Sequence, residues 1–231
     1  MAKADHNRPV ELTVYSANIH KENNDLKRLQ EDIEDVNPDV VFLMEVTNKQ
    51  LEALSELIKK YKYHAIDSRI TQKNARGIGV VFLSRYDVTV KRLTPLAKSG
   101  NALFEGILQT EKGDIIFYGV HFPRHSLSGS FLMRKREFIA FARLLSRNSK
   151  PFIVAGDFNS TPYSPVFKEF LKTSNLSISD YVLSWPALFP PLWIPIDHIL
   201  TSKEIYIDNK TRGSYIGSDH YPVIADLSFA F

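Results

Sequence analysis

Two short, uninterrupted apolar runs constrain the fold more than any other feature of the sequence. Residues 40–44 read Val-Val-Phe-Leu-Met, and residues 151–155 read Pro-Phe-Ile-Val-Ala. A run of about five apolar residues is typical of a strand that is covered on both faces. Such a strand needs a further layer on each side, so the sequence predicts sheets that are buried between other elements.

The remaining periodicity predicts helices that alternate with strands and, between them, strands in pairs. Further strands are expected at residues 10–18, 78–83, 101–109, 115–122, 196–200, 205–208 and 222–229. Helices are expected at residues 25–36, 51–58, 131–147 and 164–173. This mixture predicts two packed sheets with helices outside. The sequence shows neither a linker nor an internal repeat, so we expect one domain over residues 10–231 after a flexible polar segment at residues 1–9.

Charge and composition exclude several classes of protein. The 29 basic and 26 acidic residues leave a net charge of +3, which is weaker than the basic excess of a typical duplex-tracking protein. The absence of cysteine excludes disulfides, thiolate zinc sites and cysteine nucleophiles. No stretch approaches the roughly 20 apolar residues of a spanning helix. We expect a soluble monomer as given, and the compartment stays open: cytoplasmic, or membrane-associated or periplasmic if the chain is the excised domain of a longer protein.

Polar residues stand directly beside most of the predicted strands. Strand ends and the adjoining loops are where rigid scaffolds present catalytic groups. Gathered at one rim, carboxylates and amides could hold a hard cation, and histidines could move protons. Taken singly, such residues are more often turn formers, caps or core histidines, although a glutamate that ends the apolar run 40–44 is harder to explain in this way. The candidates are Asn18, Glu45, His121, Asp157, Asn159, Asp197, Asp219 and His220.

Six short segments, taken in order along the chain, carry a resemblance to a known family. They are Ser-Ala-Asn-Ile (16–19), Leu-Met-Glu-Val (43–46), Val-His-Phe (120–122), Gly-Asp-Phe-Asn (156–159), Ile-Asp-His-Ile-Leu (196–200) and Ser-Asp-His-Tyr-Pro-Val (218–223). The set resembles the motifs of the endonuclease/exonuclease/phosphatase superfamily, which includes deoxyribonuclease I, apurinic endonucleases and bacterial sphingomyelinases. The resemblance implies an α/β (α+β) fold, a four-layered αββα sandwich of two packed mixed sheets flanked by helices. It also implies a divalent-metal-dependent hydrolase of phosphoester bonds.

The resemblance implies a metal site among these residues. Glu45 would bind Mg²⁺ or Mn²⁺ directly, and Asn18 and Asp219 would lie close to the ion or its waters. Carboxylate and amide oxygens are ligands that hard cations prefer. A cation that bridges phosphate oxygens stabilises the charge that develops during phosphoryl transfer.

The resemblance also implies roles for the other candidates. Asp157 would orient and deprotonate the attacking water, while Asn159 and His121 would donate hydrogen bonds to the phosphoryl oxygens. His220 would contact the phosphate or move a proton, held in its tautomer by Asp197. A neighbouring carboxylate favours the imidazolium form of a histidine, which suits contact with a phosphate. Whether Asp157 or His220 is the effective base stays open.

The motifs bear on the substrate as well. Inositol polyphosphate 5-phosphatases have an arginine and an Asp-Arg pair where this chain has Ser160 and Asp197-His198. Residues 156–165 resemble a bacterial branch that includes the teicoplanin-resistance-type phosphatases, which are associated with lipid-linked pyrophosphates. We therefore expect a phosphorylated small-molecule or lipid-linked substrate. A nuclease that acts on nucleic acid is one alternative, and a catalytically inactive binding module of the same fold is another.

Polar loops beside the motif strands supply further candidates for substrate binding. Asn74, Arg76 and Arg124 could bind a second phosphate. The basic residues of the predicted helix 131–147, Arg134 among them, are expected on its solvated outer face. His198 is interpreted as structural, because strand alternation points it away from Asp197.

The segment at residues 184–195 holds both tryptophans of the chain and precedes Asp197 directly. Its four prolines exclude a helix and predict an extended or turning path. Its apolar side chains either pack on the sheet edge or form an exposed apolar wall beside the site. In the second case Trp185 and Trp193 would help to bind the hydrocarbon part of a lipid-linked substrate, or contact a bilayer surface.

Overall fold

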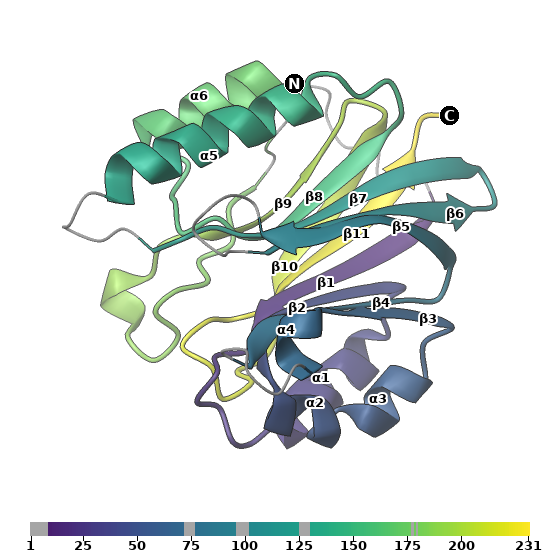
Figure 1. Ribbon diagram of the computed structural model, residues 1–231, viewed down its shortest axis with the longest axis vertical. Coiled ribbons are helices and arrows are strands. Elements are labelled where there is room, and N and C mark those ends of the chain that lie inside the picture. The colour runs from purple at the N-terminus through teal and green to yellow at the C-terminus, as the bar shows by residue number, and fades with distance from the viewer. Residues whose placement is uncertain (1–8, 72–76, 96–101, 125–129, 177, 179) are drawn as a thin grey trace.

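The protein folds into two sheets that pack face to face, with helices on both outer faces (Figure 1). The computed structural model describes residues 9–71, 77–95, 102–124, 130–176, 178 and 180–231. The αββα sandwich of mixed sheets that the sequence predicted is confirmed. Most of the predicted segment 1–9 lies outside the described residues. None of the described helices is long and apolar enough to cross a membrane.

The first sheet is six-stranded, with the order β10-β11-β1-β2-β4-β3. Its central strand β1 runs parallel to β2 and antiparallel to β11. The strands of this sheet are β1 (Leu12–Asn18), β2 (Val40–Thr47), β3 (Tyr63–Ile66), β4 (Ile78–Ser84), β10 (Ile205–Arg212) and β11 (Val223–Phe229).

The second sheet is five-stranded, with the order β5-β6-β7-β8-β9. Strand β8 runs parallel to β7 and antiparallel to β9. The strands of this sheet are β5 (Asp87–Pro95), β6 (Ala102–Thr110), β7 (Gly113–His121), β8 (Phe152–Asp157) and β9 (Asp197–Thr201).

Helices cover the outer face of each sheet, so the apolar runs at residues 40–44 and 151–155 are buried on both sides, as predicted. The first sheet is covered by α1 (Lys27–Val36), α2 (Asn48–Ala53), α3 (Ser55–Lys59) and α4 (Ser68–Thr71). The second sheet is covered by α5 (Ser130–Leu145) and α6 (Pro165–Ser174). A short 3-10 helix, η1 (Pro190–Leu192), lies at the left of Figure 1.

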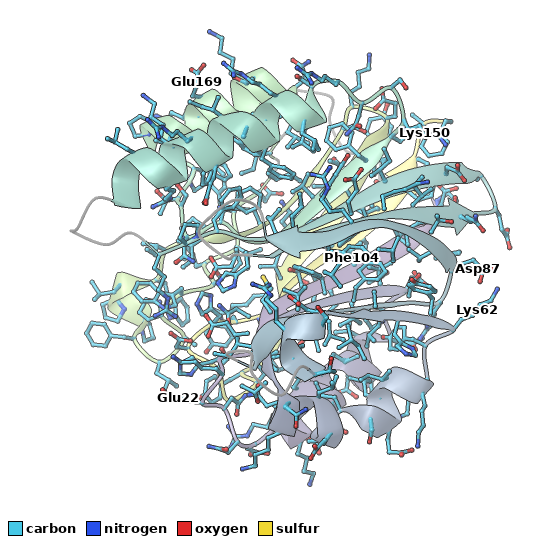
Figure 2. All side chains as sticks on the ribbon, viewed as in Figure 1. Glu22, Lys62, Asp87, Phe104, Lys150 and Glu169 are labelled. Carbon is cyan, nitrogen blue, oxygen red and sulfur yellow. The ribbon has the colours of Figure 1, made fainter. Side chains whose placement is uncertain are left out.

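The space between the sheets is filled by aromatic side chains. The rings of Phe82 and Phe104 stack with their centroids 4.2 Å apart, and Phe117 packs on Phe82 at 5.1 Å. Figure 2 labels Phe104 between the two sheets. Because such rings bury large apolar areas, this layer fixes the sheets against each other and makes the rim where their strands end a rigid platform.

Several predicted elements need correction. The expected helix 51–58 is two helices, α2 and α3, which meet at Leu54. Leu54 leaves the helical conformation (ψ 2°), and the break frees the carbonyl of Ala53 to accept a hydrogen bond from Gln30 of α1. Strands β3 and β5 and helix α4 were not predicted.

Strand direction brings the candidate residues to one edge of the sandwich. Strands β1, β2, β7 and β8 end there, whereas β9 and β11 begin there. In the register of the second sheet, Asp157 stands opposite both His121 and Asp197. Residues that are far apart in sequence therefore share one rim, as is usual for catalytic groups at strand ends.

Candidate active site

Glu45 reaches the rim through an irregularity in β2. The pairing of β2 with β4 shifts register between Leu43 and Val46, and Glu45 has a positive φ of 60°. A bulge of this kind places one extra residue in a strand and redirects its side chain. Strand β2 therefore continues to Thr47, past the predicted end at Met44. The side chain of Glu45 does not follow the in-and-out alternation of the strand and lies at the rim.

Asn18 links the two sheets at the rim. Its Nδ2 donates to Oε1 of Glu45 at 3.1 Å and lies 3.3 Å from Oδ2 of Asp157. Its Oδ1 accepts the backbone N–H of His20. Asn18 is fully buried, so this amide fixes the separation of two carboxylates that come from different sheets.

Asp157 and Asn159 are hydrogen-bonded to each other, and Phe158 between them packs away from the rim. The backbone N–H of Asn159 donates to Oδ1 of Asp157 at 2.7 Å, and Nδ2 of Asn159 donates to Oδ2 at 3.0 Å. Phe158 is buried among the aromatic rings beneath α5 and α6. The preceding Gly156 has φ 142°, and a Cβ there would lie 1.9 Å from the carbonyl oxygen of Val120. Only glycine allows strand β8 to pass this close to β7.

His220 is held by a buried carboxylate. Its Nδ1 lies 2.8 Å from Oδ2 of Asp197, and the hydroxyl of Ser184 donates to the same oxygen at 2.6 Å. The other ring nitrogen, Nε2, is buried without a hydrogen-bond partner among the described residues and lies 3.9 Å from Oδ2 of Asp157. A histidine fixed in this way presents one nitrogen in a defined direction, toward Asp157.

His121 completes the rim. Its Nε2 lies 3.7 Å from Oε1 of Glu45 and 3.8 Å from Oδ2 of Asp157. These separations exceed a hydrogen bond, so the ring faces both carboxylates without being fixed to either. A group bound between them would be within reach of His121.

The rim sets different charges on its two histidines. Burial lowers the pKa of His121 to about 4, although the negative charge of Glu45 acts to raise it. Burial also acts to lower the pKa of His220, but the hydrogen-bonded carboxylate of Asp197 outweighs it and raises the pKa to about 9. Burial, together with the charge of Asp197, raises the pKa of Asp157 to about 7. At neutral pH His220 is therefore an imidazolium, His121 is neutral and Asp157 is poised near its pKa.

Two groups of side chains could hold a metal ion. Asp157, Asp197 and His220 each offer one ligand atom within 4.8 Å of one another, but His220 and Asp197 are already hydrogen-bonded to each other there. Glu45 and Asp219 instead face one guanidinium nitrogen of Arg124, at 3.9 Å and 3.6 Å. The two carboxylates are therefore already close enough to share one cationic group. In addition, Oδ1 of Asp219 is buried without a hydrogen-bond partner among the described residues. This oxygen-rich corner is the better fit to a hard divalent cation.

The structure brings together all eight residues proposed from the motifs: Asn18, Glu45, His121, Asp157, Asn159, Asp197, Asp219 and His220. His198 lies apart from them, as predicted, with Nε2 2.9 Å from the carbonyl oxygen of Ser160.

The additional substrate-binding candidates fall in different places. Arg124 lies at the rim, whereas Asn74 and Arg76 lie outside the described residues. The indole N–H of Trp185 donates to Oδ2 of Asp219 at 3.2 Å, so this tryptophan borders the site. Trp193 packs instead against Arg212, away from these carboxylates.

Arg134 was expected in solvent, and this prediction is wrong. Its side chain is buried, and its Nη2 donates to the carbonyl oxygen of Asn159 at 2.7 Å. The first turn of α5 lies over the loop after β8, so a long side chain there can reach inward past the helix surface. Arg134 therefore supports Asn159, which has a positive φ of 47°. Helical periodicity alone assigns such a residue to the outer face.

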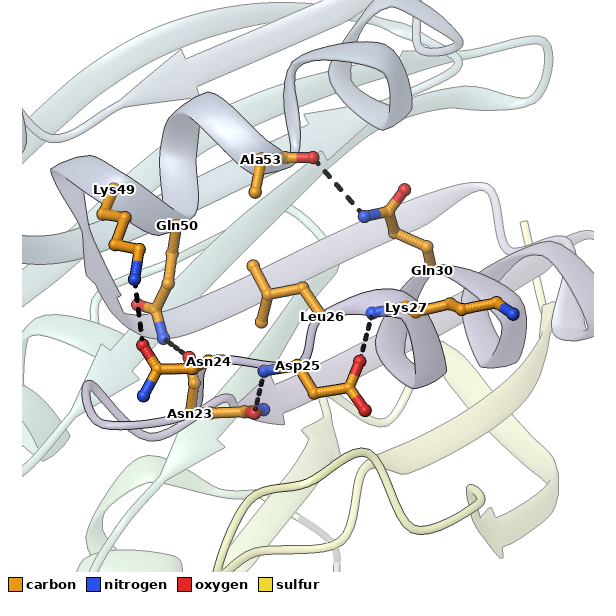
Figure 3. A pocket seen from close by; sticks show the side chains of 9 residues that line it. All are labelled: Asn23, Asn24, Asp25, Leu26, Lys27, Gln30, Lys49, Gln50 and Ala53. Atoms are coloured by element: carbon orange, nitrogen blue, oxygen red, sulfur yellow. Dashed lines mark hydrogen bonds between the residues drawn. The ribbon is translucent and has the colours of Figure 1, made fainter.

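Gln50 is a second residue that the sequence analysis missed. Its Nε2 donates to the carbonyl oxygens of His20 and Asn23, at 3.0 and 2.8 Å, and its Oε1 accepts the backbone N–H of Thr47 at 2.9 Å. Figure 3 shows Gln50 beside Asn23 and Asn24. It thereby ties the loop that follows Asn18 to the turn that follows Glu45. The Thr-x-x-Gln spacing of a capping box was the available signal.

Gln50→Ala is expected to lower the free energy of unfolding by about 2–3 kcal/mol, because buried carbonyl groups lose their donors and a cavity remains. The matched control is Gln30→Ala in the same pocket (Figure 3), which removes one exposed bond of 3.4 Å and should change stability by less than about 0.5 kcal/mol. Urea unfolding with an unchanged m-value measures both. Equal effects of the two substitutions would contradict the role given to Gln50.

A sandwich of two sheets that gathers carboxylates, amides and histidines at one rim is the architecture of a phosphoester hydrolase. A family model described as the endonuclease/exonuclease/phosphatase family matches residues 15–220. The chain belongs to this family, and it is an enzyme that hydrolyses phosphoester bonds. The sequence matches none of the curated proteins with which it was compared.

Solved structures with the same fold cover nearly the whole chain. A mannosyl-6-phosphatase of Bacteroides thetaiotaomicron is 18% identical, with a TM-score of 0.74 over 94% of this chain and 100% of that one. The catalytic domain of human nocturnin is 20% identical, with a TM-score of 0.69 over 94% of both chains. A family protein of Bacteroides vulgatus is 18% identical, with a TM-score of 0.75 over 94% of this chain and 98% of that one. At these identities the likeness shows the fold.

Proposed function

We propose that this enzyme hydrolyses a phosphoester bond of a small or lipid-linked phosphate, with Mg²⁺ or Mn²⁺ bound at Glu45 and Asp219. The observation that carries the proposal is the pair formed by His220 Nε2 and Asp157 Oδ2, which lie 3.9 Å apart without a hydrogen bond between them. Oδ2 of Asp157 accepts hydrogen bonds from the amides of Asn18 and Asn159, whereas Nε2 of His220 has no hydrogen-bond partner among the described residues. Glu45 lies next to this pair through Asn18. In this pair, Asp157 can accept a proton from a water, and His220 can donate a hydrogen bond to a phosphoryl oxygen.

Each residue of the rim has a task that follows from its charge. Asp157, with a pKa of about 7, accepts a proton from the attacking water, while Asn159 fixes the orientation of its carboxylate. The imidazolium of His220, with a pKa of about 9, donates a hydrogen bond to a phosphoryl oxygen. This assignment makes Asp157 the base.

Glu45 and Asp219 would hold the cation through carboxylate oxygens, while Asn18 keeps Glu45 in place. When bound, the cation would supply electrostatic stabilisation of the phosphoryl oxygens. This set contains no sulfur, which favours Mg²⁺ or Mn²⁺ over softer metals.

A lipid-linked substrate is supported by two observations. Residues 156–165 resemble the bacterial branch associated with lipid-linked pyrophosphates. Residues 184–195 do not all pack on the sheet edge: Leu188 is 73% exposed and Phe189 is 53% exposed, close to Trp185 at the rim. Apolar side chains beside the site suit a substrate with a hydrocarbon part.

A substrate panel tests the proposal directly. Hydrolysis is measured with Mg²⁺ or Mn²⁺ on an isoprenoid pyrophosphate, a lysophospholipid, an inositol phosphate and a nicked plasmid. We expect the first two to be turned over most efficiently, as judged by kcat/KM. Preferential cleavage of the plasmid would replace the proposal with a nuclease, and no turnover of any phosphoester would contradict it.

Asp157→Asn is expected to lower kcat by at least about 100-fold, because the amide cannot accept a proton from water. The melting temperature should change little, since removal of a buried charge offsets the loss of an acceptor for Asn159. The control is His198→Ala, which removes a buried histidine packed on Phe167, so stability should fall while kcat is much less affected. Equal losses of kcat in the two variants would contradict the role given to Asp157 as the base.

A further inference from the structure

Three large apolar side chains that are close in sequence are exposed in the segment between α6 and β9. Leu188, Phe189 and Leu192 are 73%, 53% and 60% exposed, and we call them the apolar ridge. Single exposed apolar residues are ordinary, but a contiguous group of large ones marks an interaction surface. The chain from residue 181 to residue 196 contains no charged residue. The ridge surrounds η1, at the left of Figure 1.

The backbone of the ridge satisfies much of its own hydrogen bonding. The N–H of Leu192 donates to the carbonyl of Phe189 at 3.0 Å, and that of Phe189 donates to the carbonyl of Pro186 at 3.2 Å. Pro190 and Pro191 have no N–H to satisfy. Few backbone donors would lose water if the ridge entered an apolar medium, so the cost of burying it there is small.

The ridge is attached to the rim of the site. The N–H of Ala187 donates to the carbonyl oxygen of Asp219 at 2.8 Å, and the indole of Trp185 donates to the carboxylate of the same residue. Ala187 is buried. Whatever binds the ridge is therefore held at a fixed position relative to Asp219.

A basic and aromatic surface continues from the ridge. The guanidinium of Arg212 lies over the rings of Trp193 and Tyr221, 4.2 and 4.3 Å from their centroids. Tyr215 packs on Tyr221, and the guanidinium of Arg28 lies 5.5 Å from the centroid of Tyr215. Arg28 also lies 4.0 Å from the carboxylate of Asp25, whereas Arg212 forms no ion pair with a described carboxylate. We call these five residues the Arg212 patch.

The combination matches the layers of a lipid bilayer. Exposed leucine and phenylalanine gain most from acyl chains, whereas tryptophan and tyrosine favour the level of the headgroups. Arginines beside them complement anionic phosphate groups, each contributing about 1 kcal/mol near a charged membrane surface.

We propose that the apolar ridge and the Arg212 patch dock on an anionic bilayer, with the ridge among the acyl chains and the guanidiniums among the headgroups. The active-site rim then faces the membrane, and the phosphoester it receives is one that the bilayer presents. The proposed binding to the bilayer depends only on the apolar ridge and the Arg212 patch. The presentation of substrate by the bilayer, in contrast, rests on the proposed function.

Vesicle sedimentation tests the docking without any turnover. The wild-type protein should bind vesicles of phosphatidylcholine and phosphatidylglycerol, and more weakly vesicles of phosphatidylcholine alone. Changing Leu188, Phe189 and Leu192 together to serine should weaken binding to both by at least about 10-fold. Arg212→Ala should weaken binding by about 5-fold, and only where phosphatidylglycerol is present. The matched control is Leu132→Ser on α5, a leucine that is 65% exposed elsewhere and should bind like the wild type.

Three results would overturn the docking: no binding by the wild type, equal binding by the triple variant, or equal loss in the Leu132→Ser control. Self-association that disappears in the triple variant, without vesicle binding, would assign the ridge to an interface between copies of this chain. Melting temperatures near that of the wild type ensure that the variants are folded. Turnover of a soluble phosphodiester is measured separately, so failure of the proposed function and failure of docking give different results.

Discussion

Removal of divalent cations is expected to abolish turnover, and Mg²⁺ or Mn²⁺ is expected to restore it. Glu45 and Asp219 gather negative charge at a corner where the guanidinium of Arg124 and the imidazolium of His220 offset it only in part. Without a divalent cation, a phosphate that approached this corner would meet carboxylates of its own sign. The measurement is hydrolysis of a chromogenic phosphodiester in chelator-treated buffer, before and after the metal is added back. Full turnover in metal-free buffer would contradict the prediction.

Glu45→Gln sharpens this test because it keeps the shape of the side chain and removes its charge. The Mg²⁺ concentration for half-maximal activity should rise by at least about 10-fold. The metal should also raise the melting temperature of the wild type more than that of the variant, since a ligand that binds the folded state stabilises it. Glu22→Gln, an exposed glutamate in the loop after β1, is the matched control and should change neither quantity.

The parts of the fold that local patterns determine were predictable. The apolar runs at β2 and β8 identified strands that helices and a second sheet cover, and these layers were confirmed. Strand β3 was missed because its residues are half-buried or exposed and show no clear alternation. The alternation of β5 changes where its register with β6 shifts, between Val90 and Arg92. Such irregularities depend on the partner strand, which a local pattern does not contain.

The residues that form the candidate site could be predicted from the sequence, but the contacts that hold them in position could not. The motif residues stand at strand ends, so sequence alone could propose that they meet. The bulge at Glu45 was not predictable, because it arises in the pairing of β2 with β4. Arg134 and Ser184 act through contacts with Asn159 and Asp197, which are distant in sequence, and their own neighbours in sequence give no sign of this. Helical periodicity placed Arg134 on the solvated face of its helix, whereas the side chain is buried.

His220 and Asp197 are expected to act as one unit. His220→Ala and Asp197→Asn should each lower kcat by about 100-fold or more at neutral pH, because either change removes the oriented imidazolium. The double variant should be nearly as slow as His220→Ala alone, since the main task of the Asp197 carboxylate is to orient the histidine, and its charge beside Asp157 adds a smaller effect. Steady-state kinetics of the four proteins measure this coupling. Losses that multiply in the double variant would mean that Asp197 has a separate role.

The same pair predicts how stability depends on pH in the metal-free protein. Burial acts to lower the pKa of His220, but the charge and hydrogen bond of Asp197, with further help from the charges of Asp157 and Asp219, raise it from 6.5 to about 9, so the folded state holds this proton more tightly than the unfolded state does. The stabilisation is fully present below pH 6.5 and is lost as the pH rises through about 9. Asp157 contributes a similar loss at lower pH, which ends near its own pKa of about 7. The melting temperature of the wild type should therefore fall between about pH 7 and pH 9. That of Asp197→Asn should fall much less, because burial then opposes only the weaker effects of Asp157 and Asp219 on the pKa of His220. Parallel curves for the two proteins in this interval would show that the pair does not hold a proton in the folded state.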